Sequence, residues 1–118
     1  MKVLIVGSRN IRDFDLSDYV PSDTELIISG GAVGMDAVAE RYADQYKIPK
    51  LIIRPDYEKY GRSAPLKRND VMVDHADLVI AVWDGVSRGT KYTIDRAEKK
   101  NKAVKLIRAS NKLSDEKE

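Results

Sequence analysis

Two glycine-rich turns hold the residues of this chain with the clearest capacity for chemistry. Each turn follows a run of Ile, Leu and Val and precedes a helix-forming segment, which places its backbone N–H groups at a helix N-terminus. Such N–H groups favour a phosphate or a carboxylate. Together with a shorter turn after the first apolar run, they indicate a nucleotide-type ligand. The turn residues that we expect to bind it are Gly7, Ser8, Arg9, Ser29, Gly30, Gly31, Gly34, Asp84, Gly85, Ser87, Arg88, Gly89 and Thr90.

Three charged side chains in or beside these turns extend this chemistry. Arg9 and Arg88 each offer a planar guanidinium that matches a phosphate; the alternative for either is a solvated surface residue. Asp36 falls in the first turn of the helix that follows Gly34. Its carboxylate either compensates the helix dipole or accepts hydrogen bonds from a ribose or from the neighbouring loop.

Three further candidates lie outside the turns. Arg68 and Asn69 fall one turn into a predicted helix, where Arg68 either faces the site or forms a surface salt bridge. Trp83 ends an apolar run, and it either stacks on a base or packs against the protein.

Five short apolar runs alternate with helical patterns along the chain. The runs are nearly continuous in Val, Ile and Leu, as is typical of parallel strands buried on both faces. The expected strands are Lys2–Val6, Glu25–Ser29, Lys50–Arg54, Asp77–Trp83 and Ala103–Ile107. The expected helices are a short one around Phe14–Tyr19, then Met35–Tyr46, Pro65–His75 and Thr90–Lys100, with an irregular segment over Pro55–Ala64.

This alternation predicts an α/β fold: a single, three-layered Rossmann-like domain with about five parallel strands in the order 3-2-1-4-5, flanked by helices. We expect the domain to span residues 1–109, followed by a polar C-terminal tail over residues 110–118. In an open parallel sheet, ligands bind beyond the carboxyl ends of the strands. The turns after Val6, Ser29, Arg54 and Trp83 should therefore meet on one edge of the sheet.

Composition excludes several classes of function. The chain has no Cys and one His, so we predict neither a metal site nor a cofactor that such residues would hold. The absence of a signal-peptide pattern and of a long apolar stretch predicts a cytoplasmic protein that does not enter a membrane. A net charge of only +2 over 118 residues makes nucleic acid an improbable partner.

Read in order, the motifs GSR (7–9), SGGAVGMD (29–36), PDY…G (55–61), APxxRNxxM (64–72), DxVIAVWDG (77–85) and SRGT (87–90) resemble the SLOG superfamily of small Rossmann-like proteins. That superfamily includes the lonely-guy phosphoribohydrolases, molybdenum-cofactor carrier proteins and DprA-type DNA-processing proteins. The chain is most similar to a compact YspA-like branch. The resemblance covers residues 2–108 and implies a nucleotide pocket over the strand ends and a homo-oligomer, with a dimer favoured.

The resemblance does not carry over a catalytic pair. The phosphoribohydrolases place a Glu three residues after the Thr of their glycine-rich motif, where this chain has Thr93, and an Arg near the position of Val71. The catalytic residues of any reaction therefore stay unassigned. We expect binding or sensing of a phosphorylated, nucleotide-like small molecule. The alternatives are hydrolysis of its N-glycosidic or phosphate bond by Asp36, Asp84 or Asp95, and binding of single-stranded DNA.

Overall fold

The structure of the protein is a computed structural model that describes residues 1–109. Within them, five parallel strands form one sheet in the order β3-β2-β1-β4-β5, as predicted. The two central strands, β1 and β4, consist almost entirely of buried apolar residues because helices or loops cover both of their faces. The strands are β1 (Lys2–Gly7), β2 (Leu26–Ser29), β3 (Lys50–Ile52), β4 (Leu78–Trp83) and β5 (Ala103–Arg108).

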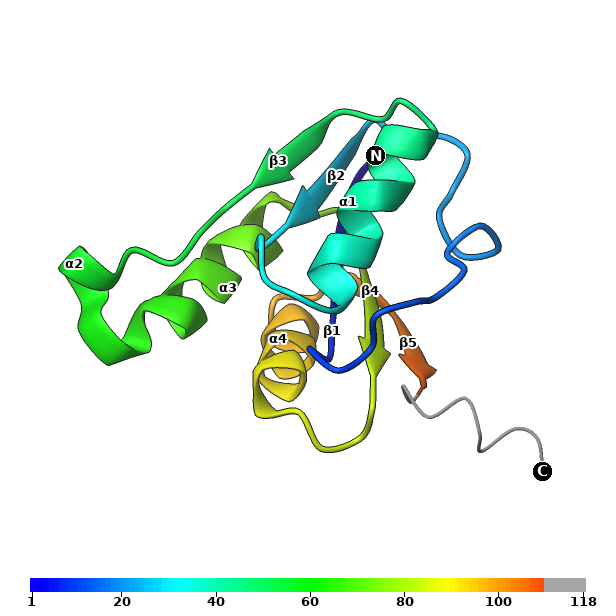
Figure 1. The fold of residues 1–118 in the computed structure, drawn as a ribbon. Helices are drawn as coiled ribbons and strands as arrows, with labels where there is room; N and C mark the ends of the chain where they lie inside the picture. Colours follow the sequence, from blue (N-terminus) through cyan, green and yellow to red (C-terminus); the bar gives the residue numbers. More distant parts are fainter. Residues whose placement is uncertain (110–118) are drawn as a thin grey trace.

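The helices cover the two faces of the sheet and complete a three-layered domain (Figure 1). The helix α1 (Met35–Gln45) packs on one face, and α3 (Ala64–His75) and α4 (Arg88–Lys99) pack on the other. A short helix, α2 (Tyr57–Tyr60), extends away from the sheet beside the start of α3.

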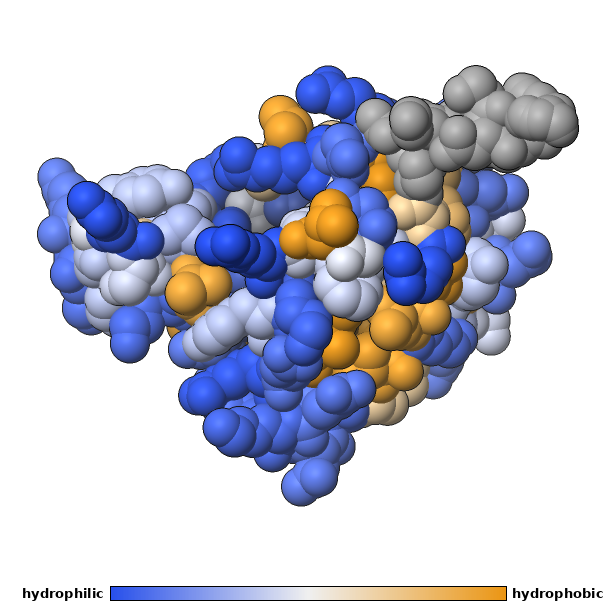
Figure 2. Space-filling view, turned by 90° about the horizontal axis from the view of Figure 1, so that it is seen from below, coloured by the Kyte–Doolittle hydropathy of each residue, from blue (hydrophilic) through white to orange (hydrophobic). Residues whose placement is uncertain are grey.

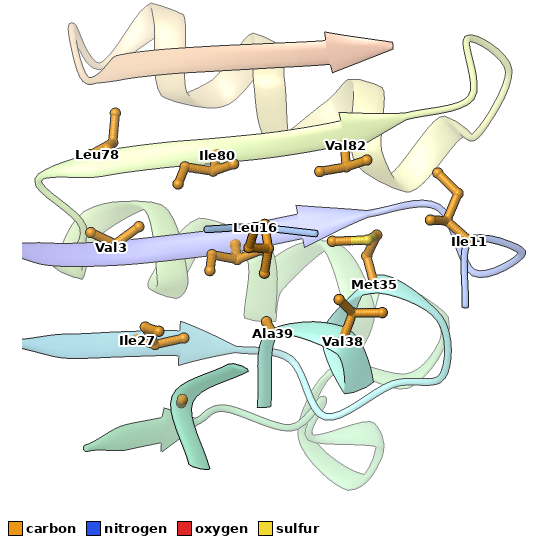
Figure 3. Packing of buried hydrophobic residues seen from close by; sticks show 12 residues of the cluster. Val3, Ile11, Leu16, Ile27, Met35, Val38, Ala39, Leu78, Ile80 and Val82 are labelled. Atoms are coloured by element: carbon orange, nitrogen blue, oxygen red, sulfur yellow. The ribbon is translucent and has the colours of Figure 1, made fainter. Parts of the chain in front are cut away.

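Alternate residues of the strands point to the two opposite faces of the sheet and build a core on each. On the α1 side, side chains of β1, β2 and β4 meet Met35 and Val38 of α1, as well as Ile11 and Leu16 of the β1–β2 connection (Figure 3). On the other side, residues such as Leu4 and Val79 pack against the apolar residues of α3 and α4.

The expected helix around Phe14–Tyr19 is wrong: the β1–β2 connection contains only a turn there. The Asp15 carboxylate accepts hydrogen bonds from both the backbone N and the Oγ of Ser17, at 2.9 and 2.6 Å. Such local side-chain bonds compete with helical ones. The connection still contributes to the core through its apolar residues, because Leu16 is fully buried.

The segment predicted as irregular, Pro55–Ala64, is largely helical instead. It contains α2 and a 3-10 turn, Gly61–Ser63, that leads directly into α3. Asp56 caps α2 by accepting a hydrogen bond from the backbone N of Lys59 at 3.1 Å. Asp56 is therefore a local start signal for α2 that the prediction missed.

The predicted polar tail, residues 110–118, lies outside the described residues. None of the helices within residues 1–109 combines the length and the apolarity needed to cross a lipid bilayer.

Candidate functional site

A cleft of about 260 Å³ opens beyond the carboxyl end of β1, between the starts of α1 and α4 and the flank of α3. Figure 2 views the molecule from below Figure 1, the side on which β1 and β4 end. Hydrophilic residues dominate this face and leave apolar surface near its middle. The cleft is lined by Val6, Gly7, Arg9, Ala32, Val33, Asp36, Pro65, Leu66, Arg68, Asn69, Met72, Ser87, Gly89, Thr90 and Thr93.

The start of α4 presents free hydrogen-bond donors to this cleft. The first N–H groups of any helix have no acceptor within it. Those of Arg88, Gly89 and Thr90 find none among residues 1–109 either. The Ser87 hydroxyl does not cap the helix but lies 3.2 Å from the Thr90 hydroxyl. Apart from its chain neighbours and the backbone of α4 itself, no heavy atom lies within 4 Å of the position that a Cβ on Gly89 would occupy, so this first turn is open.

A separate set of bonds holds the α4 turn in shape. The Asp84 carboxylate accepts hydrogen bonds from the backbone N of Val86 and of Ser87, at 2.9 and 2.8 Å. The backbone N of Asp84 donates in turn to Ser8 Oγ at 3.0 Å. Burial opposes ionisation of Asp84, but the hydrogen bonds to its carboxylate, led by those from Val86 and Ser87, together lower the pKa of that carboxyl below its ordinary value.

The start of α1 differs in that its first turn carries an acidic residue that lines the cleft, and the loop amides before it bond to the protein. The backbone N of Gly31 donates to Ser29 Oγ at 3.2 Å, and that of Ala32 donates to Asp36 Oδ2 at 3.1 Å. The backbone N of Met35 donates to the carbonyl oxygen of Ser8 at 3.3 Å. The amides of Gly31 and Ala32 are therefore not available to a ligand. Here the protein supplies its own anion, Asp36, at the helix N-terminus.

Arg68 reaches from α3 to the ends of β2 and β3. Its Nη1 donates to the carbonyl oxygens of Gly30 and Ile53, at 2.7 and 3.2 Å, and its Nε donates to Asn69 Oδ1 at 2.8 Å. The approach requires glycine at position 30, since a Cβ there would lie 2.5 Å from Nη1. Burial lowers the pKa of Arg68 and the nearby Asp36 partly offsets this, but a guanidinium stays charged in a protein.

Asp36 is the acidic residue of the cleft wall and is only 9% exposed. Burial raises the pKa of its carboxyl, while the hydrogen bond from Ala32 and the charge of Arg68 offset part of the rise. Among residues 1–109 it forms no ion pair within 4.0 Å. The site thus keeps a poorly solvated carboxylate that no cation neutralises directly.

Asp36→Asn is expected to raise the melting temperature by a few degrees at neutral pH. An acid whose pKa is raised by folding lowers stability above both its pKa values, and this penalty disappears below the unfolded value near 3.8. Asparagine removes the charge and keeps an acceptor for the Ala32 amide. Thermal denaturation from pH 7 downward should show an advantage that shrinks as the pH falls. Equal or lower stability of the variant at pH 7 would contradict the assignment.

Several predicted residues do not line the cleft. Trp83 donates from Nε1 to the carbonyl oxygen of Ser87 at 2.9 Å, and the Arg108 guanidinium lies 5.6 Å from the Trp83 ring centroid. Trp83 therefore packs against the protein, which is the second of the two interpretations that its sequence position allowed. Arg88 is exposed at the start of α4 and does not line the cleft. The remaining predicted residues that do not line it are Ser8, Ser29, Gly30, Gly31, Gly34, Asp84 and Gly85.

Other lining residues were not among the candidates. Two of them share a face of α3 with the candidate Asn69: Pro65 lies four residues before it and Met72 three residues after it. Extending the face of Asn69 by this spacing would have found Pro65 and Met72. Thr93 lines the cleft, and its Oγ1 donates to the carbonyl oxygen of Gly89 at 3.1 Å. No local signal marks Val33, which is exposed beside the cleft.

Comparison with known proteins gives two relatives. The chain is 32% identical over 111 residues to the Gene 61 protein of Mycobacterium phage D29, in a match that spans 83% of this chain and 89% of the phage protein. It is 36% identical over 59 residues to the uncharacterized SPbeta prophage-derived protein YoqJ of Bacillus subtilis (strain 168), covering 48% of this chain but only 30% of YoqJ. No protein-family model and no solved structure matches the chain.

Proposed function

The chain belongs to the family of the Gene 61 protein of Mycobacterium phage D29, and from the geometry of its cleft we propose that it binds a small phosphorylated ligand of the nucleotide type. The anionic group of the ligand lies at the N-terminus of α4. The rest of the ligand extends along the cleft towards Asp36 and α3.

The open first turn of α4 carries this proposal. Three free amides and the hydroxyls of Ser87 and Thr90 converge there. The first helical turn contains no acidic residue, and Asp84, which precedes it, does not line the cleft. Backbone amides at a helix N-terminus, reinforced by the helix dipole, form a favourable phosphate site. Gly89 leaves room for the anion to approach the backbone closely.

Two arginines add positive charge to the same cleft. Arg9 follows β1, Arg68 comes from α3, and both line the cavity. Arg68 commits Nη1 and Nε to protein acceptors, whereas its Nη2 has no hydrogen-bond partner among residues 1–109. A guanidinium fixed in this way is a preorganised donor for a phosphate oxygen.

The cleft favours a small ligand. Its volume of about 260 Å³ lies just below the range of roughly 300–1,000 Å³ that is typical of small-molecule pockets. We therefore propose a mononucleotide or a sugar phosphate rather than a dinucleotide. The proposal agrees with the nucleotide pocket that the resemblance to the SLOG superfamily implies.

The contacts of the acidic residues favour binding over hydrolysis. Of the three carboxylates considered for catalysis, Asp36 alone lines the cleft. Asp84 holds the α4 turn, and Asp95 pairs with Lys91 at 2.8 Å on the exposed side of α4. A single carboxylate leaves the second partner of an acid–base pair unassigned.

Thr90→Val is expected to weaken binding of adenosine 5′-monophosphate about five- to tenfold, because it removes one hydroxyl donor from the anion site and keeps the shape of the buried side chain. Isothermal titration calorimetry measures the change. Thr24→Val is the matched control, since the Thr24 hydroxyl bonds to the carbonyl oxygen of Pro21 away from the cleft. Failure of the unaltered protein to bind any mononucleotide, sugar phosphate or inorganic phosphate would overturn the proposed function.

A further inference from the structure

We propose that Asp36 determines specificity in this cleft by requiring the ligand to present a hydrogen-bond donor, a sugar hydroxyl, beside its anionic group. The inference rests on the proposed function and goes beyond it, because it names which phosphorylated ligands the site accepts and which it rejects.

The two helix starts give the cleft opposite electrostatic ends. At α4, free amides and hydroxyls face the cleft without an acidic residue, which suits an anion. At α1, the corresponding position is filled by the Asp36 carboxylate. A ligand that reaches both ends must therefore be an anion at one end and a donor at the other.

The Asp36 carboxylate is held in place but not saturated. Its Oδ2 accepts the hydrogen bond from the Ala32 amide at 3.1 Å, and its Oδ1 accepts none from residues 1–109. A carboxylate has about four lone-pair sites, so it retains capacity for a ligand donor. Because burial raises the pKa of this carboxyl, its charged form is poorly solvated and gains from any further donor.

The charges that face Asp36 do not substitute for such a donor. Arg68 and Arg9 influence it from α3 and from the turn after β1, but neither lies within the 4.0 Å of an ion pair. Glu40, one turn further along α1, adds negative charge and accepts a hydrogen bond from Ser29 Oγ at 2.9 Å. The Asp36 carboxylate would repel a bare anion at this end, whereas a hydroxyl would donate a hydrogen bond to its free Oδ1.

The test compares two ligands that differ only in hydroxyl groups. Adenosine 5′-monophosphate and its 2′,3′-dideoxy analogue share the base and the phosphate, so calorimetric titration of both isolates the contribution of the sugar hydroxyls. We expect the unaltered protein to prefer the hydroxylated nucleotide about tenfold or more, the effect of hydrogen bonds to a charged acceptor.

Substitution of Asp36 should remove this preference. In Asp36→Ala the two nucleotides should bind within about twofold of each other, since the acceptor is gone. In Asp36→Asn the new amide N–H can face the cleft, so inorganic phosphate should bind more tightly than it does to the unaltered protein. The second variant keeps the acceptor for Ala32 and so tests the inference if the alanine variant folds poorly.

Glu40→Gln is the matched control. It removes one negative charge from the same helix one turn away, and Glu40 does not line the cleft. It should leave the preference for the hydroxylated nucleotide intact. Equal affinity of the unaltered protein for the two nucleotides, or equal loss of preference in Glu40→Gln and Asp36→Ala, would overturn the inference while leaving the proposed function standing. Absence of binding by every phosphorylated probe would overturn the proposed function instead.

Discussion

Gly34→Ala is expected to lower the free energy of unfolding by about 2–4 kcal/mol. Gly34 is the residue before α1 and adopts φ 80° and ψ −132°, a conformation that side-chain-bearing residues rarely adopt. A Cβ there would also lie 2.5 Å from the Cα of Arg9, where only backbone could yield. Urea denaturation followed by circular dichroism measures the loss.

Gly89→Ala is the matched control for this prediction. Gly89 lies inside the first turn of α4 without a positive φ, and its new Cβ would meet no atom within 4 Å beyond its chain neighbours and the backbone of α4 itself. Because alanine favours a helix over glycine by up to about 1 kcal/mol, this variant should be as stable as the unaltered protein or more stable. A loss of stability in Gly89→Ala equal to that in Gly34→Ala would contradict the explanation from backbone geometry.

Arg68→Ala is expected to destabilise the fold by about 2–4 kcal/mol and to weaken nucleotide binding at least about tenfold. The guanidinium is the hydrogen-bond donor to the carbonyls of Gly30 and Ile53, so its removal leaves acceptors at the ends of two strands without this partner. The same change removes a positive charge from the cleft. Urea denaturation and calorimetric titration with adenosine 5′-monophosphate measure the two losses separately.

Arg54→Ala provides the comparison for Arg68. Arg54 also donates to a glycine carbonyl of the β2–α1 turn, that of Gly31 at 3.1 Å, but it is exposed and does not line the cleft. Exposed contacts of this kind contribute little, so its loss should change stability by less than about 1 kcal/mol and leave nucleotide affinity unchanged. Equal losses of stability and of nucleotide affinity in Arg54→Ala and Arg68→Ala would contradict the role assigned to Arg68.

The fold was predictable because its main signal is local. The continuous apolar runs of β1 and β4 could be buried only as central parallel strands, and the observed strand order matches the expected one. Element ends were less predictable. The structure begins α4 at Arg88, two residues before the expected start at Thr90, and it ends β3 at Ile52, two residues before the expected Arg54. Terminal turns depend on individual hydrogen bonds rather than on a repeated pattern.

The two segments that were predicted wrongly also depend on individual hydrogen bonds rather than on a repeated pattern. In the β1–β2 connection, the short-range bonds of Asp15 to Ser17 prevail over a weak helical pattern, while Leu16 is buried by contacts with a distant part of the chain. Over Pro55–Ala64, α2 begins at a cap that is a single hydrogen bond, from the backbone N of Lys59 to Asp56, and no repeated pattern in the sequence marks it.

The sequence alone predicts that two glycine-rich turns follow strands, precede helices and stand at the same edge of a parallel sheet. It could not distinguish them, since both combine glycines with a following helix. The folded structure separates them. Both turns bond their loop amides to the protein, but the α1 turn places an acidic side chain, Asp36, in the cleft, whereas Asp84 of the α4 turn does not line it. Position along the chain cannot reveal this difference, because the cleft is formed by segments that only packing brings together, as when Arg68 of α3 reaches the carbonyl oxygen of Gly30, 38 residues away.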